Sequence, residues 1–219
     1  MLLIKNKIFT ISLILFILLC GFREQSWISV VDLCVFAQAI LLSISLVWLK
    51  FWYFITNIGS GGFVYVLAGF LAISYLWKNK SFLDFSIIAL TIVLFLMPSL
   101  FKEIYHLPRP VCLAPFYPEL LSYTFPSGHA FNGVVLFYFI PRLYHLAFYD
   151  DDNYSQLMRF CLSPWISVPG ITLIAMSRVF LGVHWLSDVI GGVLLGLTTC
   201  SLSLYLLRLP NKRPATSDY

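Results

Sequence analysis

Charged side chains are scarce in this chain of 219 residues: Asp, Glu, Lys and Arg together make up 11% of it. A soluble domain carries about a quarter charged residues, so this composition cannot cover a solvated globular surface. The charges are scattered and the net charge is only +4, which excludes the basic footprint of a nucleic-acid-binding protein. The scarcity of charge therefore excludes a soluble enzyme and a disordered chain, and it indicates a membrane protein.

Cysteine patterns that bind a metal or build a disulfide framework are also missing. There is no Cys-x-x-Cys pair, and no Cys or His spacing typical of a zinc site. Most of the cysteines lie in or beside apolar runs, where a cysteine usually acts as a small hydrophobic residue. The sequence therefore predicts no metal site and no cofactor.

The sequence does have long apolar stretches. Hydrophobic residues make up 60% of the chain, and the mean hydropathy is +0.88. A helix needs about 20 apolar residues to cross a bilayer. The candidate stretches are Ile8–Leu19, Gly61–Trp77, Leu83–Leu100, Ala130–Leu146, Leu157–Met176 and Trp185–Leu207. We predict an all-α, polytopic membrane helix bundle of about six transmembrane helices, forming one membrane-embedded domain over residues 1–219 with a polar cytoplasmic tail at 208–219.

A further apolar stretch, Val30–Leu49, is ambiguous because Asp32, Gln38 and two serines interrupt it. Its length would allow it to span the membrane, and its polarity would allow it to lie in the interface. If it does not cross, and the N-terminus is cytoplasmic, most Lys and Arg residues fall on the cytoplasmic side, as the positive-inside rule expects. We therefore favour six helices with both chain ends in the cytoplasm, and the state of Val30–Leu49 stays open.

Three polar clusters interrupt the apolar pattern. They are Lys102 with Arg109, then Ser127 to His129, then Arg178 with His184 and Asp188. Residues 101–128 hold five prolines and are predicted to form a loop. Two predicted spans separate this loop from the third cluster, and two crossings return the chain to the same face. All three clusters can therefore meet on one side of the membrane, whether or not Val30–Leu49 crosses.

Such a meeting would build a phosphate site without a metal. Lys102, Arg109 and Arg178 supply fixed positive charges, and guanidinium groups match phosphate oxygens in pairs. Ser127 and Gly128 sit where a helix is predicted to begin, and free backbone N–H groups at a helix N-terminus attract anions.

The histidines add the means to cleave a phosphate ester. His184 and Asp188 are four residues apart, so we expect them on one face of a helix. A carboxylate there can orient one imidazole nitrogen and leave the other as a nucleophile. His129 is then available to protonate the leaving oxygen as a general acid.

Each cluster alone has an ordinary structural interpretation. Lys102 and Arg109 could anchor the chain at lipid headgroups, and the Ser127 segment could simply cap a helix. The three clusters lie on the same predicted face, at helix ends, and their chemistry is complementary. These features would rarely coincide by chance, so together they favour a functional site.

The spacing of these residues resembles a known family. The motifs are Lys102-x6-Arg109-Pro110, Pro126-Ser127-Gly128-His129 and Ser177-Arg178-x5-His184-x3-Asp188. They match, without a departure, the three-part signature of the type-2 phosphatidic acid phosphatases, over residues 102–188. The resemblance implies a six-helix membrane fold with the active site at the outer face. It implies His184 as nucleophile, His129 as acid, Asp188 as orienting residue, and Lys102, Arg109, Ser127, Gly128 and Arg178 as phosphate ligands.

The expected function is a metal-independent membrane lipid phosphatase that works through a phosphohistidine. The substrate stays open among undecaprenyl pyrophosphate, phosphatidylglycerol phosphate, phosphatidate and lipid A 1-phosphate. We expect a bacterial inner membrane, with the active site on the periplasmic or outer face, and no partners beyond the bilayer and the lipid phosphate. The alternative is a non-catalytic lipid-phosphate binder or transporter, which would not need the set of His129, His184 and Asp188.

Overall fold

The computed structural model describes residues 7–43, 45–79, 81–113, 122–148 and 156–208. Within these ranges the chain forms helices, turns and short loops, with no strand. The all-α prediction is confirmed. The tail beyond Arg208, which we predict to be polar and cytoplasmic, lies outside the described residues.

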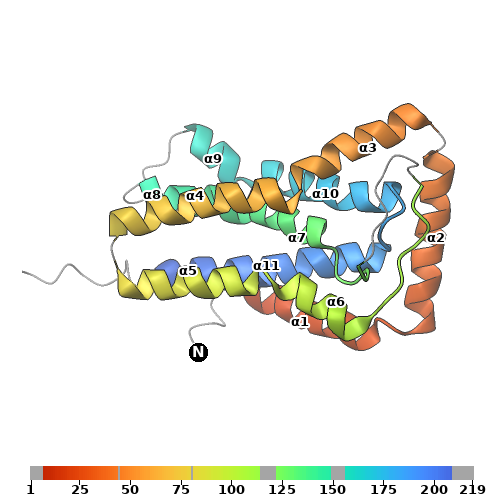
Figure 1. Cartoon of the computed structure of the whole chain (residues 1–219), viewed down its shortest axis with the longest axis horizontal. Helices are drawn as coiled ribbons and strands as arrows, with labels where there is room; N and C mark the ends of the chain where they lie inside the picture. Colours follow the sequence, from red (N-terminus) through yellow and green to blue (C-terminus); the bar gives the residue numbers. More distant parts are fainter. Residues whose placement is uncertain (1–6, 44, 80, 114–121, 149–155, 209–219) are drawn as a thin grey trace, which may run out of the picture.

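Most helices run along the long axis of the molecule, while α2 lies across one end of the bundle (Figure 1). The elements are α1 (Lys7–Phe22), α2 (Ser26–Leu42), α3 (Leu46–Ile58), α4 (Gly61–Asn79), α5 (Phe82–Leu94), α6 (Met97–Tyr105), α7 (Gly128–Val134), the π-helical segment η2 (Val135–Phe139), α8 (Ile140–Phe148), α9 (Gln156–Leu162), α10 (Pro164–Phe180) and α11 (Leu186–Arg208). Helix α11 is the central helix, because α1, α5, α7 and α10 all pack against it.

Among the residues that the structure describes, three helical segments are long and apolar enough to cross a membrane. They are Leu46–Lys78, Phe82–Tyr105 and Leu186–Arg208, and the bent pair α1–α2 would make a fourth. Helix α10 is apolar but shorter, and the π-helical segment interrupts the helix that begins at Gly128. The membrane helix bundle is thus confirmed, whereas the count of about six spans stays a prediction.

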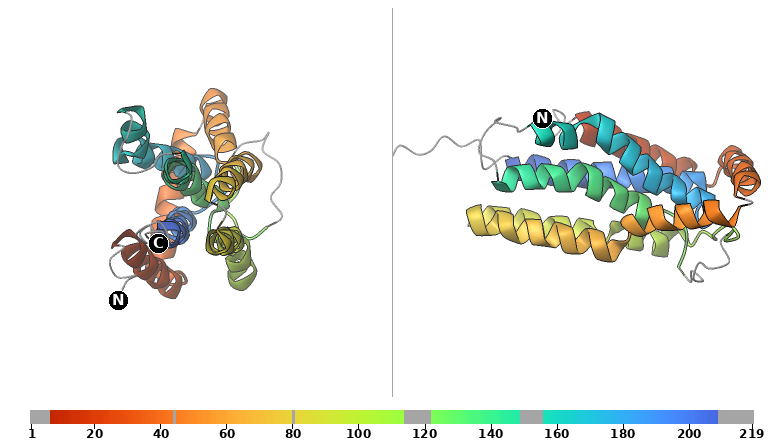
Figure 2. Two further views of the ribbon diagram at one scale, coloured as in Figure 1. Left: turned by 90° about the vertical axis from the view of Figure 1, so that its left-hand side faces the viewer. Right: turned by 90° about the horizontal axis from the view of Figure 1, so that it is seen from above.

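The stretch Val30–Leu49 does not form one helix. Helix α2 ends at Leu42, and α3 begins at Leu46 and leads into α4. Helix α2 bends from α1 by 99°, and two views show it lying across the end of the bundle (Figures 1 and 2). This orientation favours the interfacial alternative for α2. Asp32, one of the polar residues that interrupt the apolar stretch, is buried against the bundle.

Two prolines begin helices at positions where the sequence predicts something else. Pro98 lies near the predicted end of one apolar stretch, and Pro164 lies inside another. Pro98 lies at the start of α6, which continues to Tyr105, so the prediction of a loop from residue 101 is wrong at its start. Pro164 begins α10 after a break at Ser163, and α10 continues to Phe180. A proline fits the first turn of a helix because it lacks only an N–H that would have no partner there. As a result Lys102 lies in the last turn of a helix.

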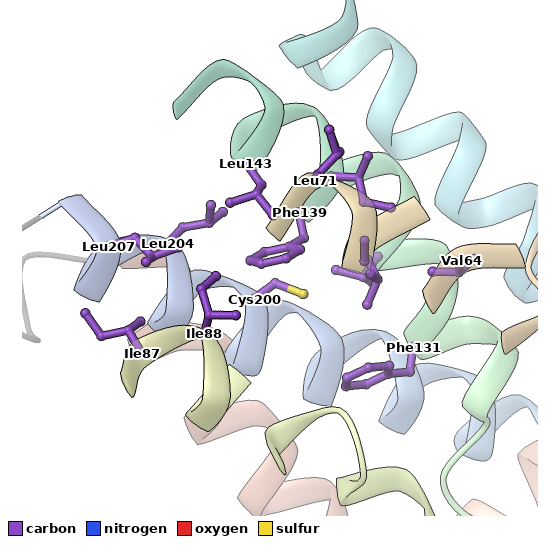
Figure 3. Packing of buried hydrophobic residues seen from close by; sticks show 14 of the residues in the cluster. Val64, Leu71, Ile87, Ile88, Phe131, Phe139, Leu143, Cys200, Leu204 and Leu207 are labelled. Carbon is purple, nitrogen blue, oxygen red and sulfur yellow. The ribbon is translucent and has the colours of Figure 1, made fainter. Parts of the chain in front are cut away.

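The apolar core lies between α4, α5, α8 and α11 (Figure 3). Phe139 of the π-helical segment and Cys200 of α11 are both buried there. All five cysteines are free thiols, and Cys200 serves as a small hydrophobic side chain. The core extends along the bundle from Phe125 near the start of α11 to Leu207 near its end.

Candidate active site

The structure brings the three predicted clusters together at the end of the bundle that α2 crosses (Figure 1). Arg109 of the first cluster lies 3.1 Å from His184 of the third, measured from Nη1 to Nε2. The backbone N–H of Ser127, in the second cluster, donates to the carbonyl of Asp188 at 2.9 Å. Two crossings of the bundle separate the clusters in sequence, and the return to one end agrees with the sequence argument.

His184 lies in the turn between α10 and α11, so it precedes the helix on which we expect it. Its Nδ1 is 3.5 Å from Asp188 Oδ2, which is longer than an ordinary hydrogen bond. The Thr124 hydroxyl lies between them, 3.0 Å from His184 Nδ1 and 2.5 Å from Asp188 Oδ2. Thr124 therefore links the carboxylate to the imidazole.

The hydrogen bonds assign the tautomer of His184. The Thr124 hydroxyl donates to the Asp188 carboxylate, so its oxygen can accept from His184 Nδ1–H. Arg109 can only donate, so His184 Nε2 accepts from its guanidinium. The ring is then neutral with a lone pair on Nε2, and that lone pair faces a cationic group.

Asp188 also fixes the start of α11. It is the third residue of this helix, and its Oδ2 accepts the backbone N–H of Trp185 at 2.8 Å. An acidic side chain at this position commonly reaches back to the residue before the helix, as one half of a capping box. The carboxylate is fully buried, so its orientation is set by these partners.

The cations of the first cluster hold the loop before Ser127. Arg109 donates through Nε to the carbonyl of Ser122 at 2.7 Å and through Nη2 to that of Tyr123 at 3.1 Å. Lys102 Nζ donates to the same Tyr123 carbonyl at 2.5 Å. The two positive charges thus converge on one side of His184.

Arg178 supplies a third positive charge from the last turn of α10. Its side chain is 1% exposed, and Nη1 donates to Thr56 Oγ1 of α3 at 2.6 Å. A buried guanidinium keeps its charge because its pKa lies far above neutrality. Arg178 therefore acts on the site as a fixed cation.

The Ser127 turn, which begins α7, packs against the first turns of α11. Ser127 is the N-cap of α7, and its hydroxyl faces the backbone N–H of Ala130 at 3.5 Å. A Cβ added at Gly128 would meet nothing within 4 Å, whereas one added at Gly192 of α11 would collide with the Ser127 carbonyl oxygen. Gly192 thus allows the close approach, and Gly128 leaves open space beside the half-buried His129.

His129 and His184 both lie outside the candidate membrane spans. Burial, followed by the positive charge of Arg178, lowers the pKa of each ring well below its ordinary value of 6.5. Lys102 and Arg109 act in the same direction on both. Both imidazoles are therefore neutral at neutral pH in the free protein.

Sequence analysis missed several residues of the site. Thr124 and Thr56 have no motif of their own, and Arg23 pairs with Asp188 across 165 residues at 3.2 Å. Asp32 is the exception, because a carboxylate within an apolar stretch is a visible signal. Gly192 could have been noticed only as one glycine among others in the last span.

Comparison with known proteins identifies a matching family. A family model described as the PAP2 superfamily matches residues 82–212. Phosphatidylglycerophosphatase B of Bacillus subtilis is 31% identical over 147 residues, which cover 65% of this chain and 67% of that protein. Lipid A 4'-phosphatase of Porphyromonas gingivalis is 30% identical over 76 residues, covering 35% of this chain and 26% of that protein.

A further relative and a solved structure extend the comparison. Sphingosine-1-phosphate phosphatase 1 of Mus musculus is 28% identical over 126 residues, covering 55% of this chain and 27% of that protein. The crystal structure of a transmembrane PAP2 type phosphatidylglycerolphosphate phosphatase from Bacillus subtilis has the same fold. Its TM-score is 0.73 at 23% identity, over 95% of this chain and 98% of that one. The family model covers more than half of the chain, from Phe82 onward, and includes all three polar clusters; the chain belongs to the PAP2 superfamily.

Proposed function

We propose that this chain is a membrane lipid phosphatase that transfers the phosphoryl group of its substrate to His184 and then to water. The observation that carries the proposal is the state of His184. Its Nδ1 is held by Thr124 and its Nε2 lies 3.1 Å from Arg109, so the nucleophilic lone pair faces the group that would hold a phosphate oxygen.

The first step forms one bond and breaks another. His184 Nε2 attacks the terminal phosphorus, the P–O bond to the leaving group breaks, and His129 gives its proton to the departing oxygen. Asp188, acting through Thr124, stabilises the positive charge that develops on the His184 ring. A phosphate in the site adds negative charge beside His129, which opposes the lowering of its pKa by Arg178 and lets the ring carry the proton.

The second step releases phosphate. His129, now neutral, takes a proton from a water molecule that attacks the phosphorus, and the P–N bond to His184 breaks. Lys102, Arg109 and Arg178 stabilise the charge on the phosphoryl oxygens through both steps. Gly128 contributes its backbone N–H, and Ser127, whose own N–H is bonded to Asp188, contributes its hydroxyl. Because these groups supply the positive charge, we propose that no metal ion is required, and activity is expected to persist in excess chelator.

A lipid substrate fits the surroundings of the site. An apolar groove of about 290 Å³ lies between α4 and α5, with Tyr65, Ala68 and Phe95 in its lining. Phe95 contacts Phe131, which follows His129 by two residues. The groove thus reaches the helix that begins at the site, and it suits an acyl or prenyl chain. The relative that is 31% identical over 65% of this chain is a phosphatidylglycerophosphatase, so phosphatidylglycerophosphate is our first candidate substrate.

The charge distribution favours a site on the periplasmic or outer face of a bacterial inner membrane. Arg208 ends α11, while the site lies at its start, and a helix of this length spans roughly 35 Å. Arg142 and Arg159 lie near Arg208, because the three line one cavity. Basic residues mark the cytoplasmic face, so the site would face away from it. We further propose that residues 1–219 act as one phosphatase domain, since the turn between α1 and α2 contributes Arg23 to the site.

The test is phosphate release from a lipid panel by purified protein in detergent, with and without EDTA. The panel holds phosphatidylglycerophosphate, phosphatidate, undecaprenyl pyrophosphate, lipid A 1-phosphate and sphingosine 1-phosphate. We expect turnover of at least one lipid, no turnover by His184→Ala, and an acid-labile, base-stable phosphate on the quenched wild-type protein. Turnover that survives His184→Ala would reject the nucleophile. Tight binding of a lipid phosphate without any turnover would instead support the non-catalytic alternative.

A further inference from the structure

A buried ion cluster joins the N-terminal helices to Asp188. Arg23 follows α1, and its Nη2 lies 3.2 Å from Asp188 Oδ1 and 3.5 Å from Asp32 Oδ2. The three side chains are 7%, 5% and 0% exposed for Arg23, Asp32 and Asp188. One guanidinium therefore bridges two buried carboxylates, and one of them is the orienting carboxylate of the proposed mechanism.

Asp32 adds a second connection to the same turn. Its Oδ1 accepts the backbone N–H of Ser187 at 2.9 Å, and its Oδ2 accepts the Ser187 hydroxyl at 2.6 Å. Ser187 directly precedes Asp188 in the first turn of α11. Asp32 of α2 thus holds the backbone next to Asp188, while Arg23 holds the side chain.

The two oxygens of Asp188 have different partners. Oδ2 faces Thr124 and the Trp185 N–H, and Oδ1 faces Arg23. A buried carboxylate is costly to leave unpaired. Without Arg23, the carboxylate would be expected to rotate toward another donor or to bind a proton. Either change would alter the hydrogen bond between Thr124 and Asp188, and through it the orientation of His184.

We propose that Arg23 and Asp32 are positioning residues for the phosphoryl-transfer site. Arg23 holds Asp188 Oδ1 so that Oδ2 stays directed at Thr124, and Asp32 holds both Arg23 and the first turn of α11. The proposal rests on the function proposed above. It goes beyond the family match, because Arg23 and Asp32 lie before the matched residues 82–212.

The bend between α1 and α2 is what makes this arrangement possible. Arg23 lies in the turn between these helices, and α2 departs from α1 at 99°. A straight continuation of α1 would carry Asp32 away from α11, along the bundle axis. The crossing orientation of α2 instead brings Asp32 over the first turn of α11, where it contacts Ser187.

The experiment compares Arg23→Gln and Asp32→Asn in the full-length protein. A cavity of about 300 Å³ borders both residues, so polar side chains of similar size can be accommodated. We expect kcat to fall about 10- to 100-fold, by analogy with the loss of a partner that orients a metal-bound histidine. KM should change little, because Lys102, Arg109 and Arg178 still hold the phosphate. Arg23→Lys, which keeps the charge, should recover part of kcat.

Two controls separate positioning from general stability. Arg142→Gln removes another arginine that donates to backbone carbonyls, those of Tyr138 and Leu162, at the opposite end of the bundle; it should leave kcat unchanged even if thermal stability falls. Adding Arg23→Gln to Asp188→Asn should cost little further kcat, because both changes remove the same contact. Independent, multiplicative losses of kcat would contradict the proposal.

The His184 ring offers a readout without turnover. Nitrogen NMR of protein with labelled histidine should show Nδ1 protonated and Nε2 unprotonated at neutral pH in the wild type. Arg23→Gln should shift these signals, and Arg142→Gln should not. If the wild type turns over no lipid but Arg23→Gln shifts the ring, the proposed function fails and the positioning role stands. Unchanged kcat and an unchanged ring spectrum in Arg23→Gln would overturn the positioning role while the phosphatase function stands.

Discussion

The Thr124 hydroxyl occupies the 3.5 Å separation between His184 Nδ1 and Asp188 Oδ2. Thr124→Val keeps the shape of the side chain and removes this link, so the carboxylate can no longer orient the ring at hydrogen-bond distance. We expect kcat to fall about 10- to 100-fold. Thr124→Ser keeps the hydroxyl and should retain most of the activity, and steady-state kinetics on one lipid substrate would compare the two variants. Wild-type activity in Thr124→Val together with a loss in Thr124→Ser would show that the methyl group, and thus packing, is what matters.

The pH profile should report the cations around His184. Protonation of the ring removes the nucleophilic lone pair, so kcat/KM falls as the pH falls through the pKa of His184. Burial and the charges of Arg178, Arg109 and Lys102 lower this pKa, so the acid limb should lie below pH 6.5, the ordinary value for histidine. Lys102→Gln removes one of these charges, raises the pKa and should move the acid limb to higher pH.

The shift of the acid limb in Lys102→Gln can be distinguished from the loss of phosphate binding in the same variant. Lys102→Gln should also reduce kcat/KM at every pH, because a phosphate contact is lost. Arg142→Gln removes a positive charge far from the site and should leave the limb in place. An acid limb that does not move in Lys102→Gln would mean that a group other than His184 controls it.

At the level of elements, the contact between α11 and the Ser127 turn depends on Gly192. A methyl group there would collide with the Ser127 backbone oxygen and lie 3.1 Å from the Ala130 Cβ. Gly192→Ala should displace the turn that carries His129, and a displacement near 1 Å can cost about 10²-fold in rate. Gly62→Ala in α4 is the control, because a Cβ at Gly62 meets nothing within 4 Å and Gly62 does not line the apolar groove. Phosphate-release assays and thermal melts of both variants would check this, and wild-type turnover by Gly192→Ala would refute it.

The sequence predicted the positions of the helices better than their boundaries. Apolar stretches locate the helices well, since burial and lipid exposure both need the same hydrophobic residues. Pro98 and Pro164 misled the boundary prediction because a proline can begin a helix as well as end one. The separation of α2 from α3 was also not predictable, because the residues that allow the break at Ser43 and Ser45 differ little from polar residues inside other helices.

At the level of the whole molecule, the side of the membrane can be tested with two native cysteines. Cys112 follows Arg109 at the site end and is exposed, whereas Cys161 lies in α9, which borders the cavity shared by Arg142 and Arg208. Two single-cysteine proteins, retaining one or the other, would be treated with a membrane-impermeant maleimide in intact cells. We expect labelling of Cys112 and labelling of Cys161 only after lysis. The opposite pattern would invert the topology without changing the chemistry.

The sequence predicted which clusters meet, but not every contact within the site. Counting two crossings between Lys102 and His184 was sufficient, because each crossing reverses the end of the bundle that the chain occupies. The partners Thr124 and Arg23 could not be found in this way. Their roles depend on distances set by the packing of α1 and α2 against α11, and no periodicity or spacing encodes a contact across 165 residues.

The contact between Arg23 and Asp188 also bears on how the protein is made. A ribosome delivers the chain from its N-terminus, so Arg23 and Asp32 emerge long before Asp188 does. During that interval their side chains lack the partner that α11 brings, and water or lipid headgroups must solvate them. The turn between α1 and α2 can take its final position only once α11 has been inserted, and the proposed site is therefore completed only after that step.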